Sequence, residues 1–387
     1  MKRKTSLFLG FTGAIIAILA ALPICSLVAR KHRIDEKVAR VKMGINELVR
    51  NGKNADEGLN LLKRAKAAFD EQKAEEGEAL VDAALRSLGT SAVPSRPAKY
   101  SLPAYQNRES FIDLYGPPAA VKIDGYDGDC MEPFVSGDGN YLFFNNSNDP
   151  LEQTHIHMAR RTGRTTYRYL GLVSGTISQA KDMAPTIDAV GRFYFTSTRS
   201  YDKDGKSLYV GRLINQSVSG VTAVSGDITP RQPGWINMDC GVSHDGKTLY
   251  ISRAQFAIDA PAPRRSDLLL ANESKGQFVI SPQSDSVLAA INTPALEYAP
   301  CISTNERELF FTRAGELMVA GQSQGSSLRI MVAQRKTKEE PFAEPKIIAS
   351  IQGFVEAPTL TQDSSELFFH KKENAKFRIY RAVRKGR

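Results

Sequence analysis

The strongest constraint on the fold is a segment that recurs five times in the last three quarters of the chain. Each copy holds a short β-like run, a tight turn and a second run rich in aromatic residues; the copies are 132–147, 184–199, 239–253, 299–313 and 357–372. Their anchor positions lie 52, 55, 60 and 58 residues apart, at Pro133, Pro185, Cys240, Pro300 and Pro358. A repeat with a period near 50 residues is typical of identical supersecondary units packed side by side.

The composition of each copy predicts β-strands joined by tight turns. Asp138-Gly139 and Asp245-Gly246 stand between the two runs, and Asp-Gly supplies the positive φ that a hairpin turn needs. Asn305-Glu306 replaces this pair in the fourth copy and Asp363-Ser364 in the fifth, which leaves the local turn geometry of these two copies open but not the blade itself. Two further strand-like runs follow each copy, as at 155–161 and 165–173. Four strands per unit is the pattern of a propeller blade.

These copies resemble the repeat of TolB-type propellers, a WD-repeat-like unit with the pattern Pro…Ser-x-Asp-Gly…Leu-Tyr-Phe…Ser-x-Arg. The resemblance covers roughly residues 102–387 and implies a mainly β fold, a β-propeller. The run 377–385 supplies only a third strand for the fifth unit, while 117–123 is a spare strand before the first. Pairing these two runs closes a ring of five blades. Six blades are the alternative, because the family includes propellers of that size.

The N-terminus has the features of a membrane anchor. Residues 5–29 carry no charge, which is long enough for a transmembrane helix. We expect an uncleaved signal anchor over residues 1–33; a cleaved signal peptide and a lipidated Cys25 are the alternatives. Six of the nine net positive charges flank this segment, so the basic balance does not indicate a nucleic-acid partner. The flanking charges are balanced, and the extracytoplasmic placement (periplasm or cell surface) rests on the TolB-type resemblance.

Between the anchor and the repeats the sequence predicts helices and then a linker. Apolar residues recur at helical spacing through residues 34–89, with Asn54 as an N-cap for a helix that carries Leu59, Leu62 and Phe69 on one face. We expect a small bundle that buries these apolar faces; a partner-binding helical module is the alternative. Residues 90–103 contain three prolines and predict a linker. The predicted propeller therefore spans residues 104–387.

Residues just before the anchor positions should converge at one mouth of the propeller channel. Five of them are the predicted ligand-binding residues: Glu132, Asp239, Glu356, Trp235 and Tyr298. Other polar residues here recur together with an arginine after the second strand, as in Asp182 with Arg199 and Glu297 with Arg313. Antiparallel pairing brings such ends together, so these four residues are predicted to form structural ion pairs.

No catalytic, nucleotide-binding or metal-binding motif occurs in the sequence. We therefore expect no cofactor and no metal, and a binding or scaffold module for a protein, peptide or glycan at the channel mouth. The alternative is a glycoside hydrolase-like enzyme that uses two of the mouth carboxylates, an analogy with five-bladed glycosidases at the level of fold.

Overall fold

The computed structural model describes part of residues 34–48 and then residues 53–71, 73–88, 102–106, 110–148, 153–232, 234–256, 263–319, 322–374 and 376–386. The chain divides into two compact units, Met1–Tyr100 and Ser101–Arg387, here called the helical unit and the β unit. The predicted anchor (1–33) and most of the predicted linker (90–101) lie outside the described residues. No helix in the described ranges is long and apolar enough to span a membrane.

The helical unit buries its own apolar faces. Helices α2 (Asp56–Asp70) and α3 (Ala74–Ser87) pack against each other, and the described residues between 34 and 48 are also helical. Apolar side chains of all three segments are buried on their facing sides; they include Val41, Ile45, Leu62, Ala65, Val81 and Ala84. The N-cap of α2 is Ala55 rather than the predicted Asn54, whose side chain instead accepts the amide proton of Asp56 at 2.7 Å.

The first two repeats of the β unit are separate antiparallel sheets in which each strand pairs with the next along the chain. Repeat 1 contains β5 (Met131–Val135), β6 (Tyr141–Asn145), β7 (Ile156–Arg161) and β8 (Thr166–Leu172), with β4 (Lys122–Asp124) added in parallel at its outer edge. Repeat 2 contains β9 (Asp182–Ile187), β10 (Arg192–Ser197), β11 (Leu208–Ile214) and β12 (Ser217–Ala223), with helix α4 (Tyr201–Asp204) between β10 and β11.

Repeats 3 and 4 follow the same order and are joined into one sheet by a single parallel bridge, Ser266 to Leu296. Repeat 3 contains β14 (Trp235–Val242), β15 (Thr248–Gln255), β16 (Arg265–Ser274) and β17 (Gln277–Ile280), with β13 (Gly226–Asp227) in parallel outside. Helix α5 (Ser284–Val287) leads to repeat 4, which contains β18 (Leu296–Ile302), β19 (Glu308–Val319), β20 (Gln322–Gln334) and β21 (Lys346–Ile348). Two N-terminal strands join repeat 4 in parallel: β1 (Ala104–Gln106) and β2 (Ser110–Ile112).

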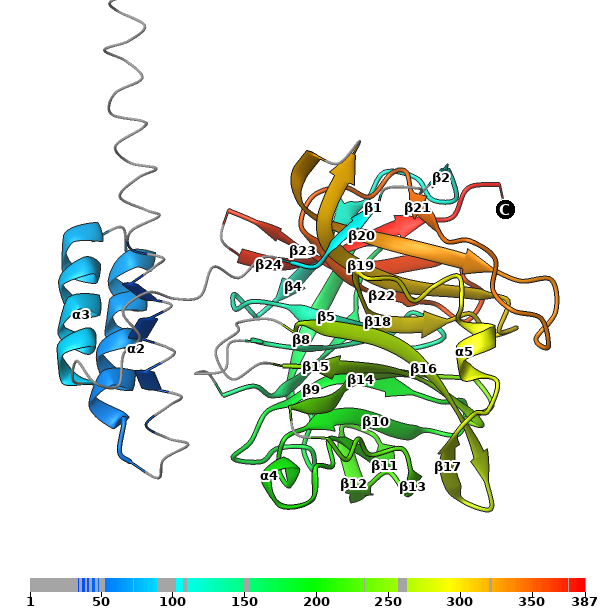
Figure 1. Ribbon diagram of the computed structural model, residues 1–387, viewed down its shortest axis with the longest axis horizontal. Helices are drawn as coiled ribbons and strands as arrows, with labels where there is room; N and C mark the ends of the chain where they lie inside the picture. The colour runs from blue at the N-terminus through cyan, green and yellow to red at the C-terminus, as the bar shows by residue number, and fades with distance from the viewer. Residues whose placement is uncertain are drawn as a thin grey trace, which may run out of the picture. The chain divides into compact units, whose positions relative to one another are not determined.

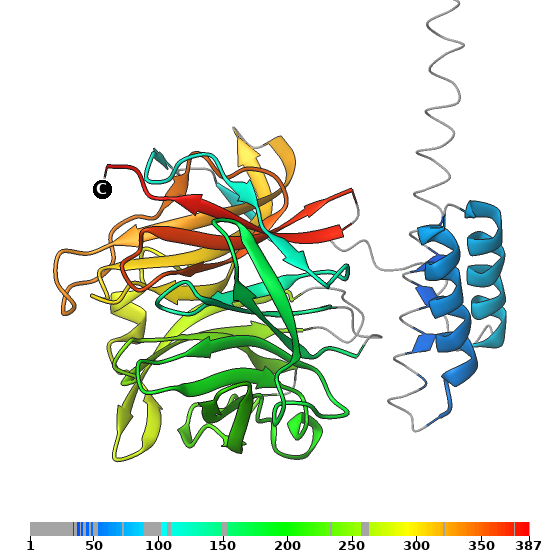
Figure 2. The ribbon, with the colours of Figure 1, turned by 180° about the vertical axis from the view of Figure 1, so that it is seen from behind.

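The last repeat takes its fourth strand from the start of the β unit. β22 (Val355–Leu360), β23 (Glu366–Glu373) and β24 (Lys376–Val383) are followed at the sheet edge by β3 (Ala119–Ala120), where Ala120 pairs with Tyr380. This is the pairing predicted for the run 117–123. Figures 1 and 2 show the red C-terminal strands beside the cyan N-terminal ones. The open edge of β24 is thereby covered by a segment some 260 residues earlier in the chain.

The first strands of the repeats surround a common centre. β5 packs beside β9, β9 beside β14, β14 beside β18, β18 beside β22, and β22 again beside β5. Between neighbouring sheets lie buried aromatic pairs, such as Phe143 with Phe193, whose ring centroids are 5.5 Å apart. Mainly β structure, radial repetition and this cyclic packing are the features of a β-propeller.

The hairpin turn is retained in the two repeats that lack glycine. Gly139 and Gly246 have positive φ, as the Asp-Gly turn requires, and so do Glu306 (φ 54°) and Ser364 (φ 57°) at the equivalent positions. The two replacements therefore leave the left-handed position of the turn unchanged. The side chain of Glu306 accepts hydrogen bonds from Lys338 and Tyr250, contacts that hold this residue in its left-handed conformation.

Candidate functional site

Every first strand contains a β-bulge, at the anchor proline in four repeats and at Met238, two residues before Cys240, in repeat 3. The pairing register between first and second strands shifts there in all five repeats. In the four repeats with an anchor proline, the residue before it takes a left-handed conformation with φ of 47–56°; these residues are Glu132, Ala184, Ala299 and Ala357. Such backbone is costly for a residue with a side chain and persists only where the surroundings hold it.

Those surroundings are a ring of hydrogen bonds from one repeat to the next. One residue of each second strand, directly after Phe-Phe, Tyr-Phe or, in repeat 3, Tyr-Ile, contacts the bulge of the following repeat through its side chain. The amides of Ala184, Ala299, Ala357 and Glu132 donate to Asn145, Ser252, Thr312 and His370, and Thr196 donates to the carbonyl of Met238. The last of the amide bonds joins the fifth repeat to the first. Sequence reasoning missed these residues, although a hydrogen-bonding side chain at this place in every copy was a readable signal.

The structure brings four of the predicted mouth residues into one electrostatic cluster, here called the acidic mouth: Glu132, Asp239, Tyr298 and Glu356. The hydroxyl of Tyr298 donates to Glu356 Oε1. The charges of Asp239 and Glu356 act on Glu132, and those of Asp239 and Glu132 act on Tyr298. The fifth predicted residue, Trp235, does not line the central cavity but a separate hollow on repeat 3.

Glu356 is the member of the acidic mouth most completely engaged. Its Oε1 accepts from Tyr298, and its Oε2 lies 3.1 Å from Nε2 of the buried His370. Burial alone would raise the pKa of Glu356, but the hydrogen bonds from His370 and Tyr298 lower it below its ordinary value. Glu356 is therefore a carboxylate at neutral pH.

Asp239 is buried and held by its own repeat and the next. It accepts from the hydroxyl of Ser252 and, at 3.2 Å, from the amide of Ala299. Burial raises the pKa of Asp239 to about 7, and these two hydrogen bonds oppose the shift. Asp239 thus titrates near neutrality while it supports the left-handed backbone at Ala299.

Glu132 is the least satisfied acid of the mouth. Asn148 donates to its Oε1 at 2.8 Å, but its buried Oε2 accepts no hydrogen bond from the described residues. Burial raises the pKa of Glu132 to about 8, and the charges of Asp239 and Glu356 add to the shift. Hydrogen bonding from Asn148 and from the backbone amide of Ala184 opposes it. A buried oxygen without a donor is unfavourable and indicates a group that a ligand can complete.

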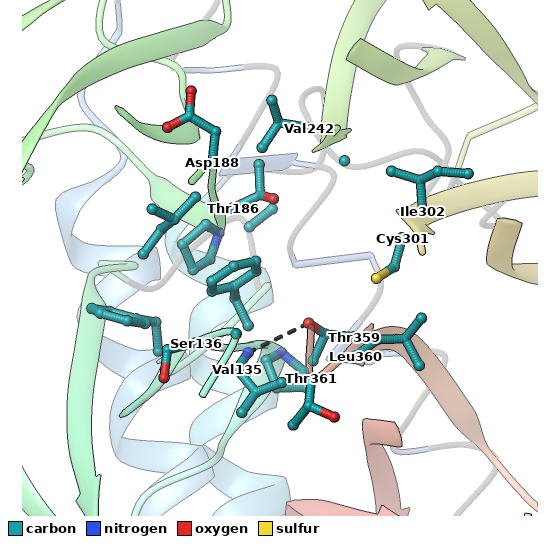
Figure 3. A pocket seen from close by; sticks show the side chains of 18 of the residues that line it. Val135, Ser136, Thr186, Asp188, Val242, Cys301, Ile302, Thr359, Leu360 and Thr361 are labelled. Carbon is teal, nitrogen blue, oxygen red and sulfur yellow. Dashed lines mark hydrogen bonds between the residues drawn. The ribbon is translucent and has the colours of Figure 1, made fainter. Parts of the chain in front are cut away.

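Two members of the acidic mouth, Glu132 and Asp239, line a central cavity of about 570 Å³ to which all five first strands contribute. Figure 3 shows one residue from each strand around it: Val135, Thr186, Val242, Ile302 and Leu360. Thr359 also faces this space and accepts the amide proton of Val135 at 3.4 Å across the junction of the last and first repeats. The wall is largely apolar, with the anchor prolines among its residues. Glu132 and Asp239 line it beside the anchor positions, and Asp138 and Asp188 line it at the hairpin turns.

The four residues predicted to form structural ion pairs lie together within their own repeats. Arg199 Nη2 is 2.7 Å from Asp182 Oδ1, and Arg313 Nε is 2.7 Å from Glu297 Oε1. Both side chains of the second pair are almost completely buried, at 4% and 0% exposure. Burial raises the pKa of Glu297 to about 7, and Arg313 opposes that shift. These acids already have cationic partners, so they do not belong to the acidic mouth.

Among the described residues no group of three or more His, Cys, Asp or Glu side chains has the geometry of a metal site. Three cysteines in these ranges, Cys130, Cys240 and Cys301, are free thiols.

No protein-family model matches the chain, and no curated protein matches it. Solved structures with a similar arrangement include TolB from Acinetobacter baumannii (10% identity, TM-score 0.35, 66% of this chain and 55% of that one). They also include a thermostable family-43 glycoside hydrolase (15%, 0.41, 70% and 96%). A third is the catalytic domain of the Coprinopsis cinerea GH62 alpha-L-arabinofuranosidase (11%, 0.43, 72% and 98%). The chain thus spans about half the length of the A. baumannii TolB, and none of these identities assigns it to a family.

Proposed function

We propose that the protein is a membrane-anchored binding module, a five-bladed propeller outside the cytoplasm whose acidic mouth receives a cationic group of a protein or peptide partner. One observation carries the ligand chemistry: Glu132 Oε2 is buried without a donor while two further acids act on it. A lysine or arginine side chain would supply both the missing donor and the opposite charge. The cyclic packing of five first strands supports the blade number.

The contacts of the other acids favour binding over hydrolysis. A glycosidase needs two carboxyl groups that face the substrate from either side of the scissile bond. Both oxygens of Glu356 are hydrogen-bonded, to Tyr298 and His370. Asp239 is hydrogen-bonded to Ser252 and to the amide of Ala299. Glu132 is left with one oxygen to offer, which is enough to anchor a cation.

Calorimetry on the full-length protein tests this proposal with two peptides that differ only in charge, Ac-Gly-Arg-Gly-Gly-amide and its citrulline counterpart. We expect the arginine peptide to bind at least about tenfold more tightly. Glu132→Gln should remove the preference, because an arginine can displace the proton of Glu132, whose pKa is about 8, whereas the amide cannot ionise. Glu339→Gln, an exposed acid of repeat 4, is the matched control and should keep it. Equal affinity for the two peptides would contradict the proposal.

One observation favours the hydrolase as a second candidate. The pKa of Glu132 is raised to about 8 while that of Glu356 is lowered, and opposite shifts in neighbouring carboxyl groups are the pattern of an acid–base pair. A glycan screen distinguishes the two functions: turnover that is lost in Glu132→Gln and Glu356→Gln, with no preference for the arginine peptide, would replace binding by hydrolysis.

Membrane placement is a proposal with its own test. The uncharged residues 5–29 support the anchor, and the TolB-type resemblance of the repeats supports the extracytoplasmic side. Protease added to intact spheroplasts should degrade residues 101–387 and leave cytosolic markers whole. Protection of this unit until the cells are lysed would place it inside.

A further inference from the structure

Repeat 3 carries a second hollow, distinct from the central cavity, which we call the Trp235 pocket. It has a volume of about 490 Å³, and its lining includes Asp227, Thr229, Arg231, Gln232, Trp235 and Arg253. None of these residues lines the central cavity. A tryptophan in a hollow provides a broad apolar face beside a polar rim.

Arg253 lacks the carboxylate partner that the equivalent arginines of two other repeats have. Arg199, Arg253 and Arg313 occupy related places after the second strand, and in each of them Nη2 donates to a backbone carbonyl of the loop before the first strand. Arg199 and Arg313 also contact a buried carboxylate. The corresponding partner of Arg253 is the neutral Asn237, whose Oδ1 accepts from Nε at 3.1 Å. Repeat 3 therefore leaves one guanidinium charge without its usual partner.

The other charges around the pocket only partly offset Arg253. Asp227 acts on it electrostatically, but Asp227 also pairs with Arg231 at 3.1 Å, and both side chains of that pair are largely exposed. The guanidinium of Arg265 lies over the ring of Trp235, 5.9 Å from its centroid, but this charge is offset by Asp267 at 3.8 Å, so the excess positive charge comes from Arg253. The pocket thus combines the indole face of Trp235 with a net positive charge. A guanidinium group recognises carboxylates through its planar fork of donors.

We propose that the Trp235 pocket binds a saccharide that bears a carboxylate. The apolar face of the sugar ring stacks on Trp235, and the carboxylate pairs with Arg253. Thr229 and Gln232 also line the pocket, and a hydroxyl and an amide match the hydroxyl groups of a sugar. An aromatic carboxylate would use the indole and the arginine but leave these two polar groups unused. This pocket and the acidic mouth have no residue in common, so either site can fail its test without the other.

Trp235 is the only tryptophan of the chain, so its fluorescence reports on this pocket alone. The full-length protein is titrated with digalacturonate and with the dimethyl ester of the same sugar, which differs by its charge. We expect digalacturonate to change the emission with saturation below about 10 mM and the ester to bind at least tenfold more weakly. Arg253→Gln should weaken digalacturonate binding at least about tenfold, whereas Arg212→Gln, an exposed arginine of repeat 2, should not.

Gln232→Ala is a second variant in case Arg253→Gln fails to fold, because the Gln232 side chain is exposed. It should weaken digalacturonate binding about threefold and leave the emission of the free protein unchanged. Three outcomes would overturn the proposal: no change in emission with digalacturonate, equal binding of acid and ester, or tighter binding of 4-hydroxybenzoate, which would assign the pocket to an aromatic acid.

Discussion

His370 Nδ1 accepts a hydrogen bond from the backbone amide of Glu132 at 2.9 Å, although 238 positions separate the two residues in the sequence. Because a backbone amide can only donate, this nitrogen carries no proton, and we infer that the ring proton is on Nε2, which faces Glu356 at 3.1 Å. One buried imidazole therefore joins the last repeat to the first and orients a carboxylate of the acidic mouth. Ring closure and the candidate site depend on the same side chain.

Replacing His370 by leucine should destabilise the β unit. The amide of Glu132 and one oxygen of Glu356 would lose their partners, and a buried polar group without a partner costs about 1–3 kcal/mol. We expect His370→Leu to lower the free energy of unfolding by about 2 kcal/mol in urea titrations. His244→Leu is the control, because that side chain is exposed. Equal unfolding midpoints for the two variants would show that the imidazole is dispensable.

Much of the fold was readable from the sequence because its signals are local and repeated. Alternating aromatic and β-branched runs, a turn pair and an anchor proline recur in phase, and each maps onto one hairpin. The closing strand was predictable from strand counting, as was the pairing of Glu297 with Arg313, since adjacent antiparallel strands bring those ends together. The bulges were not, because a left-handed Glu132 depends on a hydrogen bond from another repeat.

The candidate site was predictable only in part. Glu132 and Asp239 occupy nearly the same place in their repeats, and the ring symmetry brings such residues to one mouth. Trp235 was grouped with them although it precedes Asp239 by four residues, a distance of roughly 13 Å along an extended strand. That separation moves the indole from the channel to the outside hollow beside Arg253. His370 was missed because its role is defined by two residues of other strands.

The stability of the β unit should fall as the pH rises through the range in which Glu132 titrates. Its pKa is raised to about 8 in the folded protein, from an ordinary value of 4.5, so the folded state holds this proton more tightly than the unfolded state. The stabilisation is complete below about pH 4.5 and is lost as the pH passes 8. Glu132→Gln imitates the protonated form at every pH.

The comparison of wild type with Glu132→Gln isolates this group from other titrating acids such as Asp239. We expect equal free energies of unfolding at pH 4 and a variant that is more stable than wild type by at least about 1 kcal/mol at pH 8.5. Urea titrations at the two pH values measure both differences. A constant difference between the proteins across this range would show that Glu132 is not perturbed.

Ring closure can be tested at the short N-terminal strand. The amide of Val121, the residue after β3, donates to the carbonyl of Ile379 in β24 at 2.8 Å. Val121→Pro removes this donor and should lower the free energy of unfolding by about 3 kcal/mol. Val121→Ala keeps the amide and loses only side-chain packing, so it measures that contribution separately. If the two variants unfold at the same urea concentration, the closing strand contributes no backbone hydrogen bond to stability.

The buried pair of repeat 4 should show strong energetic coupling. Glu297 and Arg313 are 2.7 Å apart and almost fully buried, so removing one partner leaves the other polar group or charge unsatisfied at a cost of about 3–5 kcal/mol. We expect Glu297→Gln and Arg313→Met each to be strongly destabilising. The double variant should lose less free energy of unfolding than the two single variants added together, by more than about 1 kcal/mol, as measured from urea midpoints. The same cycle on Asp182→Asn and Arg199→Met, where the arginine is 23% exposed, should give a smaller coupling because solvent screens that pair. Additive effects at Glu297 and Arg313 would mean that the two do not interact, and Glu297 would then become a free acid close to the mouth.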